Sequence, residues 1–336
     1  MGVLNQHITN LLFHLTKAIT ANRYYMKYLI NIQILIFCLI AANSYASPYP
    51  ISPRPLRKLV MESSVIITGD VVKIYTKESK KKKKNISYES YHYAKIVIRE
   101  CLQGKVKDDT IEVPFNPNMA CPAPPRYYEK TTVLAFLDVE KGNYSTHALS
   151  YGAKTMDNDG INIYKQRILE IQNIQRINDE SLKKVQTIEW LVKCAENPIT
   201  RYEGIFELSP NSNFVSFYSQ DTITNNTPSL TTQQKARLKN ALLSSNDFDY
   251  DNFGLSDLIY NEYKNEIDQF LLEKLKTLDS KNYWYASEFM KRLKHLGSSP
   301  EIENLLKRQD ELDSEYNKES EQKILIDQFV TLTERH

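Results

Sequence analysis

The spacing of apolar residues changes part-way along the chain, and this change limits the fold more than any other feature of the sequence. Between residues 56 and 151, short β-branched runs alternate in polarity and are separated by turns, which is typical of strands. From residue 161 onward, apolar residues recur every three or four positions, which is typical of amphipathic helices. We therefore predict an α+β chain, with a small antiparallel β domain at residues 47–153 and an α-helical domain at residues 154–336.

Five runs in the first half are predicted to be strands. They are residues 64–75, 91–101, 110–114, 131–139 and 144–151. Gly69 lies inside the first run, where a glycine often marks a bulge or a sharp bend of the kind that small barrels need. Short strands with turns between them favour a small β-barrel or a β-sandwich.

The second half is predicted to be a stack of helices, because short polar linkers between apolar stripes force neighbouring helices to pack antiparallel. Thr200 with Glu203, and Thr231 with Gln234, fit capping boxes at helix starts. Residues 211–229 are polar and are predicted to form an exposed loop. One stripe that we expect to face the core consists of Val185, Ile188, Leu191 and Ala195.

Residues 26–46 have the layout of a secretory signal peptide. Lys27 provides a positive start, an apolar segment follows at residues 34–42, and a small-x-small cleavage site ends at Ala46. A membrane anchor needs roughly 20 apolar residues, and polar residues interrupt this run. We predict cleavage between Ala46 and Ser47, a secreted or periplasmic product, and no stable membrane span after cleavage.

Residues 1–25 precede a signal peptide that is already complete from Met26, so Met1 is either a mis-assigned start or the beginning of a long positive region.

Residues 1–46 hold three basic and no acidic residues, which leaves 40 basic and 41 acidic residues in the mature chain. A nearly neutral protein has no overall field that steers it onto nucleic acid, so we expect no nucleic-acid partner.

Three cysteines remain after cleavage, and an oxidising compartment favours one disulfide and one free thiol. If residues 91–101 and 110–114 form a hairpin, Cys101 and Cys121 lie at opposite ends of it, about 30 Å apart at the rise of a strand. A disulfide requires Cα atoms within about 7 Å, so this pair is disfavoured. We predict a disulfide between Cys121 and Cys194, with three free thiols as the alternative.

Several motifs of the first half occur in a recognisable order. They are SVIITGD at residues 64–70, AKIVIRECLQGK at residues 94–105, Cys121 with Pro122, and YEKTTVLAFL at residues 128–137. This order resembles a family of secreted bacterial proteins that carry an OB-fold domain of the netrin-like, metalloprotease-inhibitor (TIMP) type. The resemblance covers residues 56–151 and implies an OB-like barrel, followed here by a helical domain of another type. The inhibitors of this group bind a protease zinc through an N-terminal cysteine, whereas this mature chain begins with Ser47, so the resemblance implies the fold without the inhibition.

A run of lysines between the first two predicted strands is the sharpest local concentration of charge. It consists of Lys77, Lys80, Lys81, Lys82, Lys83 and Lys84. Ligand-binding OB folds often use this loop, so the run is a candidate site for phosphate-rich or sulfated polymers, anionic lipid headgroups or nucleic acid. From the sequence alone we favour the simpler interpretation, in which the run is a solvated hairpin tip.

No group of residues has the spacing of a catalytic or metal site. The histidines of the mature chain are His92, His147, His295 and His336, and none pairs with a second histidine or a cysteine at metal-ligand spacing. Residues 247–254 alternate carboxylates as a calcium loop does, but Asn252 and Leu258 stand where the glycine and the bidentate glutamate belong. We predict a polar turn before a helix there, and neither a metal nor a cofactor.

We therefore expect a secreted, non-enzymatic protein that binds an unidentified protein or a polyanionic component of the envelope. One alternative is an extracytoplasmic hydrolase that acts on envelope or extracellular polymers, and a deep cleft with two converging carboxylates would favour it. Another is a helical scaffold that docks a protein partner, which a large exposed apolar groove would support.

Overall fold

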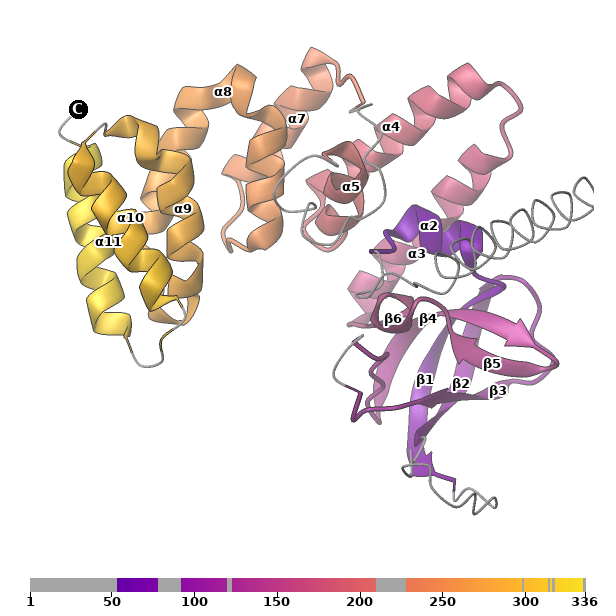
Figure 1. The fold of residues 1–336 in the computed structure, drawn as a ribbon. Helices are drawn as coiled ribbons and strands as arrows, with labels where there is room; N and C mark the ends of the chain where they lie inside the picture. The colour runs from indigo at the N-terminus through magenta and orange to yellow at the C-terminus, as the bar shows by residue number, and fades with distance from the viewer. Residues whose placement is uncertain are drawn as a thin grey trace, which may run out of the picture. The chain divides into compact units, whose positions relative to one another are not determined.

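The computed structural model describes residues 53–77, 92–119, 123–209, 228–297, 299–313, 315 and 318–334 (Figure 1). The predicted signal peptide and its cleavage site between Ala46 and Ser47 lie outside the described residues, as does most of the loop predicted at 211–229. The described strands are β1 (Val65–Thr76), β2 (His92–Gln103), β3 (Thr110–Phe115), β4 (Thr131–Glu140), β5 (Asn143–Thr146) and β6 (Ala153–Thr155). All of them pair antiparallel in one sheet, and a helical region follows along the chain, so the α+β prediction is confirmed.

The sheet is not closed into a barrel, and here the prediction was wrong. Its order is β3-β2-β1-β4-β5, with β6 also paired to β4, and among the described residues no ladder joins β3 to β5. Side chains bridge these two strands instead. The Tyr127 hydroxyl lies 2.6 Å from Oγ1 of Thr146 in β5, and its ring packs edge-on against Phe115 of β3, with centroids 5.3 Å apart. The four-residue β5 offers little edge on which a closing ladder could form.

Gly69 lies at a shift in the register between β1 and β2, which confirms the predicted irregularity there. A Cβ atom at this position would lie 2.6 Å from the Val97 carbonyl oxygen, a distance that no side chain tolerates. The glycine therefore lets β1 and β2 approach each other closely in the middle of the sheet.

Apolar side chains cover both faces of the sheet. The inner cluster draws its buried strand residues from β1, β2, β3 and β4 and includes Val65, Ile67, Val71, Ala94, Ile96, Ile111, Val113, Val133 and Leu137. On the outer face, Ile66, Leu134 and Phe136 are buried in a second core that α2 (Leu56–Glu62) and α3 (Asn158–Gln175) complete. These two helices cover the part of the outer face that β4, the beginning of β1 and the end of β2 form, where Gln172 of α3 donates a hydrogen bond to the Leu102 carbonyl oxygen at 3.2 Å.

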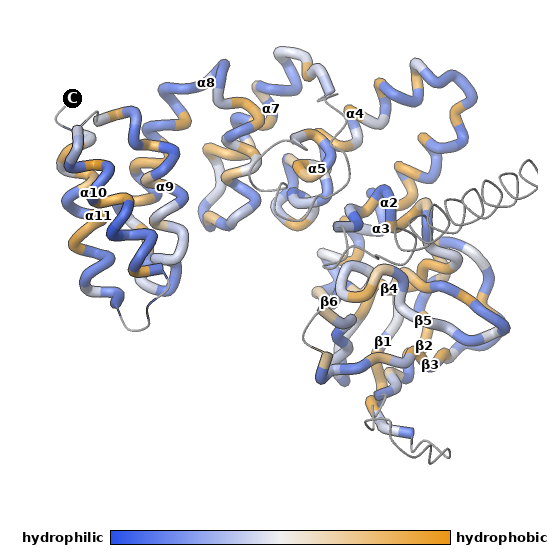
Figure 2. Tube along the Cα trace, in the orientation of Figure 1, coloured by the Kyte–Doolittle hydropathy of each residue, from blue (hydrophilic) through white to orange (hydrophobic). Residues whose placement is uncertain are grey.

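The remaining helices continue the second core toward the C-terminus (Figures 1 and 2). They are α4 (Glu180–Glu196), α5 (Arg201–Leu208), α7 (Thr232–Leu243), α8 (Tyr250–Lys276), α9 (Ala286–Leu293), α10 (Pro300–Leu312) and α11 (Glu319–Thr333). Two short 3-10 turns, η2 (Ser280–Tyr285) and η3 (Lys294–Leu296), flank α9, and a third, η1 (Leu149–Gly152), lies between β5 and β6. Figure 2 shows apolar positions recurring along each of these helices, as the sequence pattern predicts.

Two predictions about helices were wrong. Residues 56–62 form α2 rather than part of a strand region. In α4, Leu191 and Ala195 are buried, but Val185 is 61 % exposed, because the N-terminal part of this helix extends beyond the core that its C-terminal part joins.

Glu203 does not form the predicted capping box, and Thr200 makes no side-chain cap. The Glu203 carboxylate is buried instead, and it accepts hydrogen bonds from the backbone N–H of Leu56 at 2.6 Å and from the Tyr164 hydroxyl at 2.9 Å. Its third partner is the Lys154 ammonium, also at 2.9 Å. One carboxylate of α5 therefore caps α2 from a distance in sequence and ties it to α3 and β6.

The other helix starts follow local rules. Thr231 and Gln234 form the predicted capping box of α7. Asp249 caps α8 by accepting a hydrogen bond from the backbone N–H of Asn252 at 3.2 Å. Residues 247–249 precede the helix as predicted, whereas residues 250–254 already belong to α8.

Candidate ligand-binding face of the sheet

An irregularity in β1 decides which of its side chains lie on the outer face. The register with β2 shifts between Val71 and Lys73, so that Val72 is an extra residue, a β-bulge. Val71 and Ile74 consequently both pack against the inner cluster although they are three positions apart. Beyond the bulge, Lys73 and Tyr75 flank an inward residue and so point outward.

The outward residues of β1 and β2 form a cluster of tyrosines and lysines. Tyr75 and Tyr93 are opposite each other in the ladder, and their rings stack with centroids 5.9 Å apart and planes at 25°. The Lys77 ammonium lies 4.3 Å from the centroid of Tyr93 and 5.6 Å from that of Tyr75, in reach of cation–π attraction to both. We call Lys73, Tyr75, Lys77, Tyr93 and Lys95 the tyrosine–lysine face.

The Glu112 carboxylate in β3 borders the face and forms an ion pair with Lys77. The Glu129 carboxylate also lies beside β1, where it accepts a hydrogen bond from the backbone N–H of Ile74 at 2.6 Å. The hydrogen bond from Lys77 lowers the pKa of Glu112, and the same bond raises the pKa of Lys77. Burial and the hydrogen bond with Glu112 raise the pKa of Tyr75. Among the described residues, the three lysines of the face have the Glu112 and Glu129 carboxylates beside them, and the face has a local excess of positive charge.

Lys73 and Lys95 are opposite each other in the ladder, and both are exposed. Like charges in directly opposed positions destabilise a sheet by roughly 0.2–1 kcal/mol. A bound anion would neutralise this repulsion, so the pair is an unfavourable arrangement in the free protein that ligand binding relieves. Exposed Val72 and Val97 lie along the same strands, at 48 % and 38 % exposure.

Of the predicted anion-binding run, only Lys77 belongs to the described residues, whereas Lys80, Lys81, Lys82, Lys83 and Lys84 lie outside them. Reasoning from the sequence missed Tyr75, Tyr93, Lys73 and Lys95. The alternation of residues 91–101 already placed Lys95 opposite the apolar face, and Tyr93 follows from the same alternation. Nothing in the sequence marked the bulge that turns Lys73 and Tyr75 outward.

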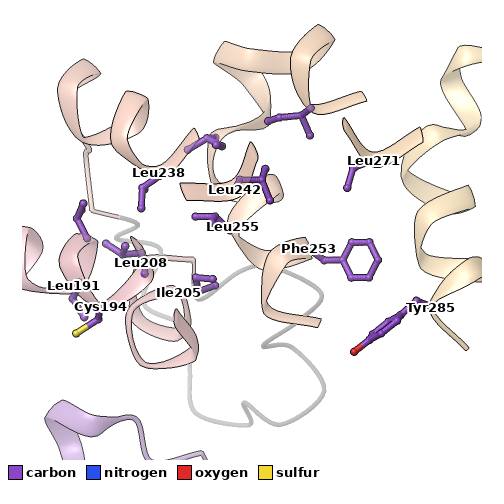
Figure 3. Close-up of a cluster of buried hydrophobic side chains, with 14 of the residues drawn as sticks. Leu191, Cys194, Ile205, Leu208, Leu238, Leu242, Phe253, Leu255, Leu271 and Tyr285 are labelled. Carbon is purple, nitrogen blue, oxygen red and sulfur yellow. The ribbon is translucent and has the colours of Figure 1, made fainter. Parts of the chain in front are cut away.

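The predicted disulfide stays a prediction, because Cys121 lies outside the described residues. Cys194 is buried among the apolar side chains of α4 and α5, near Leu191 and Ile205 (Figure 3), and burial raises its pKa. Cys101 is exposed, and neither of these two cysteines forms a disulfide with another described residue.

Two histidines contact carboxylates. Nδ1 of His147 lies 3.0 Å from the Asp138 carboxylate and its Nε2 3.2 Å from Glu62. Nε2 of His295 lies 2.7 Å from Asp268, and its Nδ1 lies 2.9 Å from the Arg292 carbonyl oxygen. Both nitrogens of each ring have protein partners. The two histidines thus link neighbouring elements, His147 linking α2 to β4 and His295 linking η3 to α8.

His92 packs edge-on against Phe115, with ring centroids 5.8 Å apart, and His336 lies outside the described residues. Within the described ranges, His, Cys, Asp and Glu side chains form no group of three or more that could hold a metal ion.

Three surface clefts bear on the hydrolase alternative. A cleft of about 860 Å³ between α2, α4 and α5 contains Glu180 and Glu207, which form ion pairs with Lys183 and Arg57. A second of about 610 Å³, beside Cys101, contains no carboxylate. The third, of about 630 Å³ between α10 and α11, contains Glu301 and Asp327, of which Asp327 is paired with Lys323. None of these three clefts therefore offers two carboxylates without cations, and they give the hydrolase no support.

No known protein family matches this chain, and a search of curated proteins finds no match. In the part of the chain that the structure describes, every helix is too short or too polar to cross a membrane.

Proposed function

We propose that this is a secreted, non-enzymatic binding protein that holds a polyanionic component of the cell envelope or its surroundings on the tyrosine–lysine face. The observation that carries the proposal is the outer face of β1 and β2, where three lysines and two tyrosines lie near the Glu112 and Glu129 carboxylates. The lysine run at residues 80–84 follows Lys77 by three positions in the sequence and adds to the positive charge of the same region. Secretion rests on the signal peptide at residues 26–46.

The strand arrangement supports an OB-like domain, as the resemblance implies. β1 lies between β2 and β4, and β3 approaches β5 through the contacts of Tyr127. In OB folds, ligands bind on the face of the second and third strands and on the loop between the first two strands. The lysine run follows β1 in the sequence, where an OB fold has the loop between its first two strands. The tyrosine–lysine face lies on β1 and β2 and shares only β2 with the binding face of an OB fold.

Heparin affinity chromatography with a salt gradient tests the proposal. The face variant carries Lys73→Ala, Lys77→Ala and Lys95→Ala. The control carries Lys264→Ala, Lys281→Ala and Lys307→Ala, which removes the same charge from exposed positions of the helical region. A second variant replaces residues 80–84 with Ser.

We expect the face variant to elute at lower salt than the control. Each lysine–anion contact releases counterions when the complex forms, so the loss of three lysines weakens binding and reduces its dependence on salt. The variant of residues 80–84 should also elute earlier, with its melting temperature nearly unchanged. Identical elution of the wild type, both variants and the control would refute the proposal. It would favour the simpler interpretation, in which the lysine run is a solvated hairpin tip. A parallel titration with single-stranded DNA distinguishes a polyanionic envelope component from nucleic acid as the ligand. Tighter binding of DNA than of heparin would identify nucleic acid as the ligand class instead.

A further inference from the structure

The last two helices of the chain form an exposed groove that the tyrosine–lysine face does not involve. α10 and α11 are joined by a short connection and bury their inner sides, which include Ile302, Leu306 and Phe329. Between their outer sides lies the groove of about 630 Å³. We call it the terminal groove, and it is lined by Glu301, Asn304, Leu305, Ile324, Asp327, Gln328, Thr331 and Leu332.

The lining follows helical spacing along both helices. Ile324, Gln328 and Thr331 occupy positions i, i+4 and i+7 of α11, and residues 301, 304 and 305 occupy i, i+3 and i+4 of α10. The lining of α11 from residue 324 to 332 extends over about 12 Å at the rise of a helix. A groove of this length, between two helices, matches about two turns of a third helix whose anchors recur with the same spacing.

The floor of the groove is apolar, and one of its side chains is left to solvent. Leu305 and Leu332 are partly buried and pack against the second core. Ile324 is 56 % exposed although it lies between residues that face the groove. Removing this apolar surface from water favours a complex, so Ile324 is the natural anchor for a partner.

The charge around the groove selects the partner. Two carboxylates, Glu301 and Asp327, line it, and none of its lining residues is a lysine or an arginine. Asp327 already pairs with Lys323, whereas Glu301 has no ion-pair partner within the described part of the chain. Residues 299–334 as a whole hold ten acidic and four basic residues. An apolar floor within an acidic surface is complementary to a helix that has one apolar side flanked by lysine or arginine.

We propose that the terminal groove docks a basic amphipathic helix of a protein partner. Apolar side chains of that helix cover Ile324, Leu305 and Leu332, and its cations meet Glu301 and Asp327. This site is separate from the tyrosine–lysine face and takes a ligand of the opposite charge, so either site can exist without the other.

Fluorescence anisotropy with a labelled amphipathic helical peptide of Leu and Lys tests this proposal, and a peptide with Glu in place of Lys is the control ligand. Two groove variants are needed, Ile324→Asp and the pair Glu301→Lys with Asp327→Lys. The control variant combines Glu303→Lys with Glu319→Lys, which makes the same change of charge at exposed positions on the same two helices. Circular dichroism and thermal melting verify that all variants fold.

We expect the Leu–Lys peptide to bind the wild type at least tenfold more tightly than the Leu–Glu peptide. Each groove variant should lose at least tenfold in affinity for the Leu–Lys peptide, while the control variant loses less than threefold. Equal losses in the groove and control variants would show only general attraction to an acidic surface and would overturn the proposal. Equal binding of the two peptides, or no binding of either, would overturn it as well.

Discussion

Asp251 allows a sharp test of how α5 and α8 pack. It lies in the first turn of α8, and burial together with the negative charge of Asp249 raises its pKa from 3.8 to about 7. The charge of Arg201 and a hydrogen bond from the Tyr202 backbone act in the opposite direction but do not outweigh burial. A carboxyl group that resists ionisation in the folded protein makes stability depend on pH.

The sign follows from proton linkage. The folded protein keeps the proton of Asp251 up to about pH 7, whereas the unfolded chain loses it near 3.8. The stabilisation is therefore fully present below about pH 4 and is lost as the pH rises to about 7. Each pKa unit corresponds to about 1.4 kcal/mol, so this group changes the free energy of unfolding by at most about 4 kcal/mol.

Asp251→Asn removes the titration and keeps an oxygen that accepts the hydrogen bond from Tyr202. Urea unfolding of both proteins at several values between about pH 4 and pH 8 gives the difference in their free energies of unfolding, in which the titration of other groups largely cancels. We expect the variant to gain up to about 4 kcal/mol relative to the wild type across this range. Asp159→Asn, at an exposed position in the first turn of α3, is the matched control and should show no such trend. A difference between Asp251→Asn and the wild type that stays constant with pH would refute the reasoning.

Three further outcomes are expected. Glu203→Gln should lower the free energy of unfolding, measured with urea, by about 3 kcal/mol, because it leaves the Lys154 ammonium without its carboxylate. Adding Lys154→Met should restore part of this loss, and additive losses would contradict the coupling of the two residues. Peptide mapping without reduction should show Cys121 joined to Cys194, and a thiol reagent should label Cys101 first; an unpaired Cys194 would end the disulfide prediction. Intact-mass measurement of protein from the native host should show a chain that begins at Ser47, and a product that retains Met26 would contradict export.

The long, periodic segments could be predicted from the sequence, because their side chains carry the information locally. The alternation of residues 91–101 corresponds to β2, and the capping box of Thr231 with Gln234 corresponds to the start of α7. What could not be predicted depends on partners distant in the sequence. The first amide of α2 is satisfied by Glu203, 147 positions away, so no local rule identifies either the helix or the role of that carboxylate.

The exposure of Val185 illustrates the same limit from another side. Its spacing with Leu191 and Ala195 predicts one continuous buried stripe, but a helical stripe is buried only as far as the neighbouring helices extend, and α4 extends beyond them.

The candidate site could not be predicted from the sequence for a different reason. Strict alternation places residues 71, 73 and 75 on one face of β1, and only the bulge at Val72 turns Lys73 and Tyr75 to the other. A single extra residue thus decides whether the tyrosine–lysine face exists.

Net charge was an equally poor guide to binding, and the physical reason is screening. At physiological ionic strength charges act over about 8 Å, so a ligand responds to the groups near its site and not to the sum over the chain. Residues 73–84 hold seven lysines and one acidic residue, whereas residues 299–334 hold ten acidic and four basic residues. The charges of these two segments, +6 and −6, cancel in the total. A nearly neutral chain therefore contains one strongly basic and one strongly acidic segment, and a ligand that contacts only one of them meets that local charge.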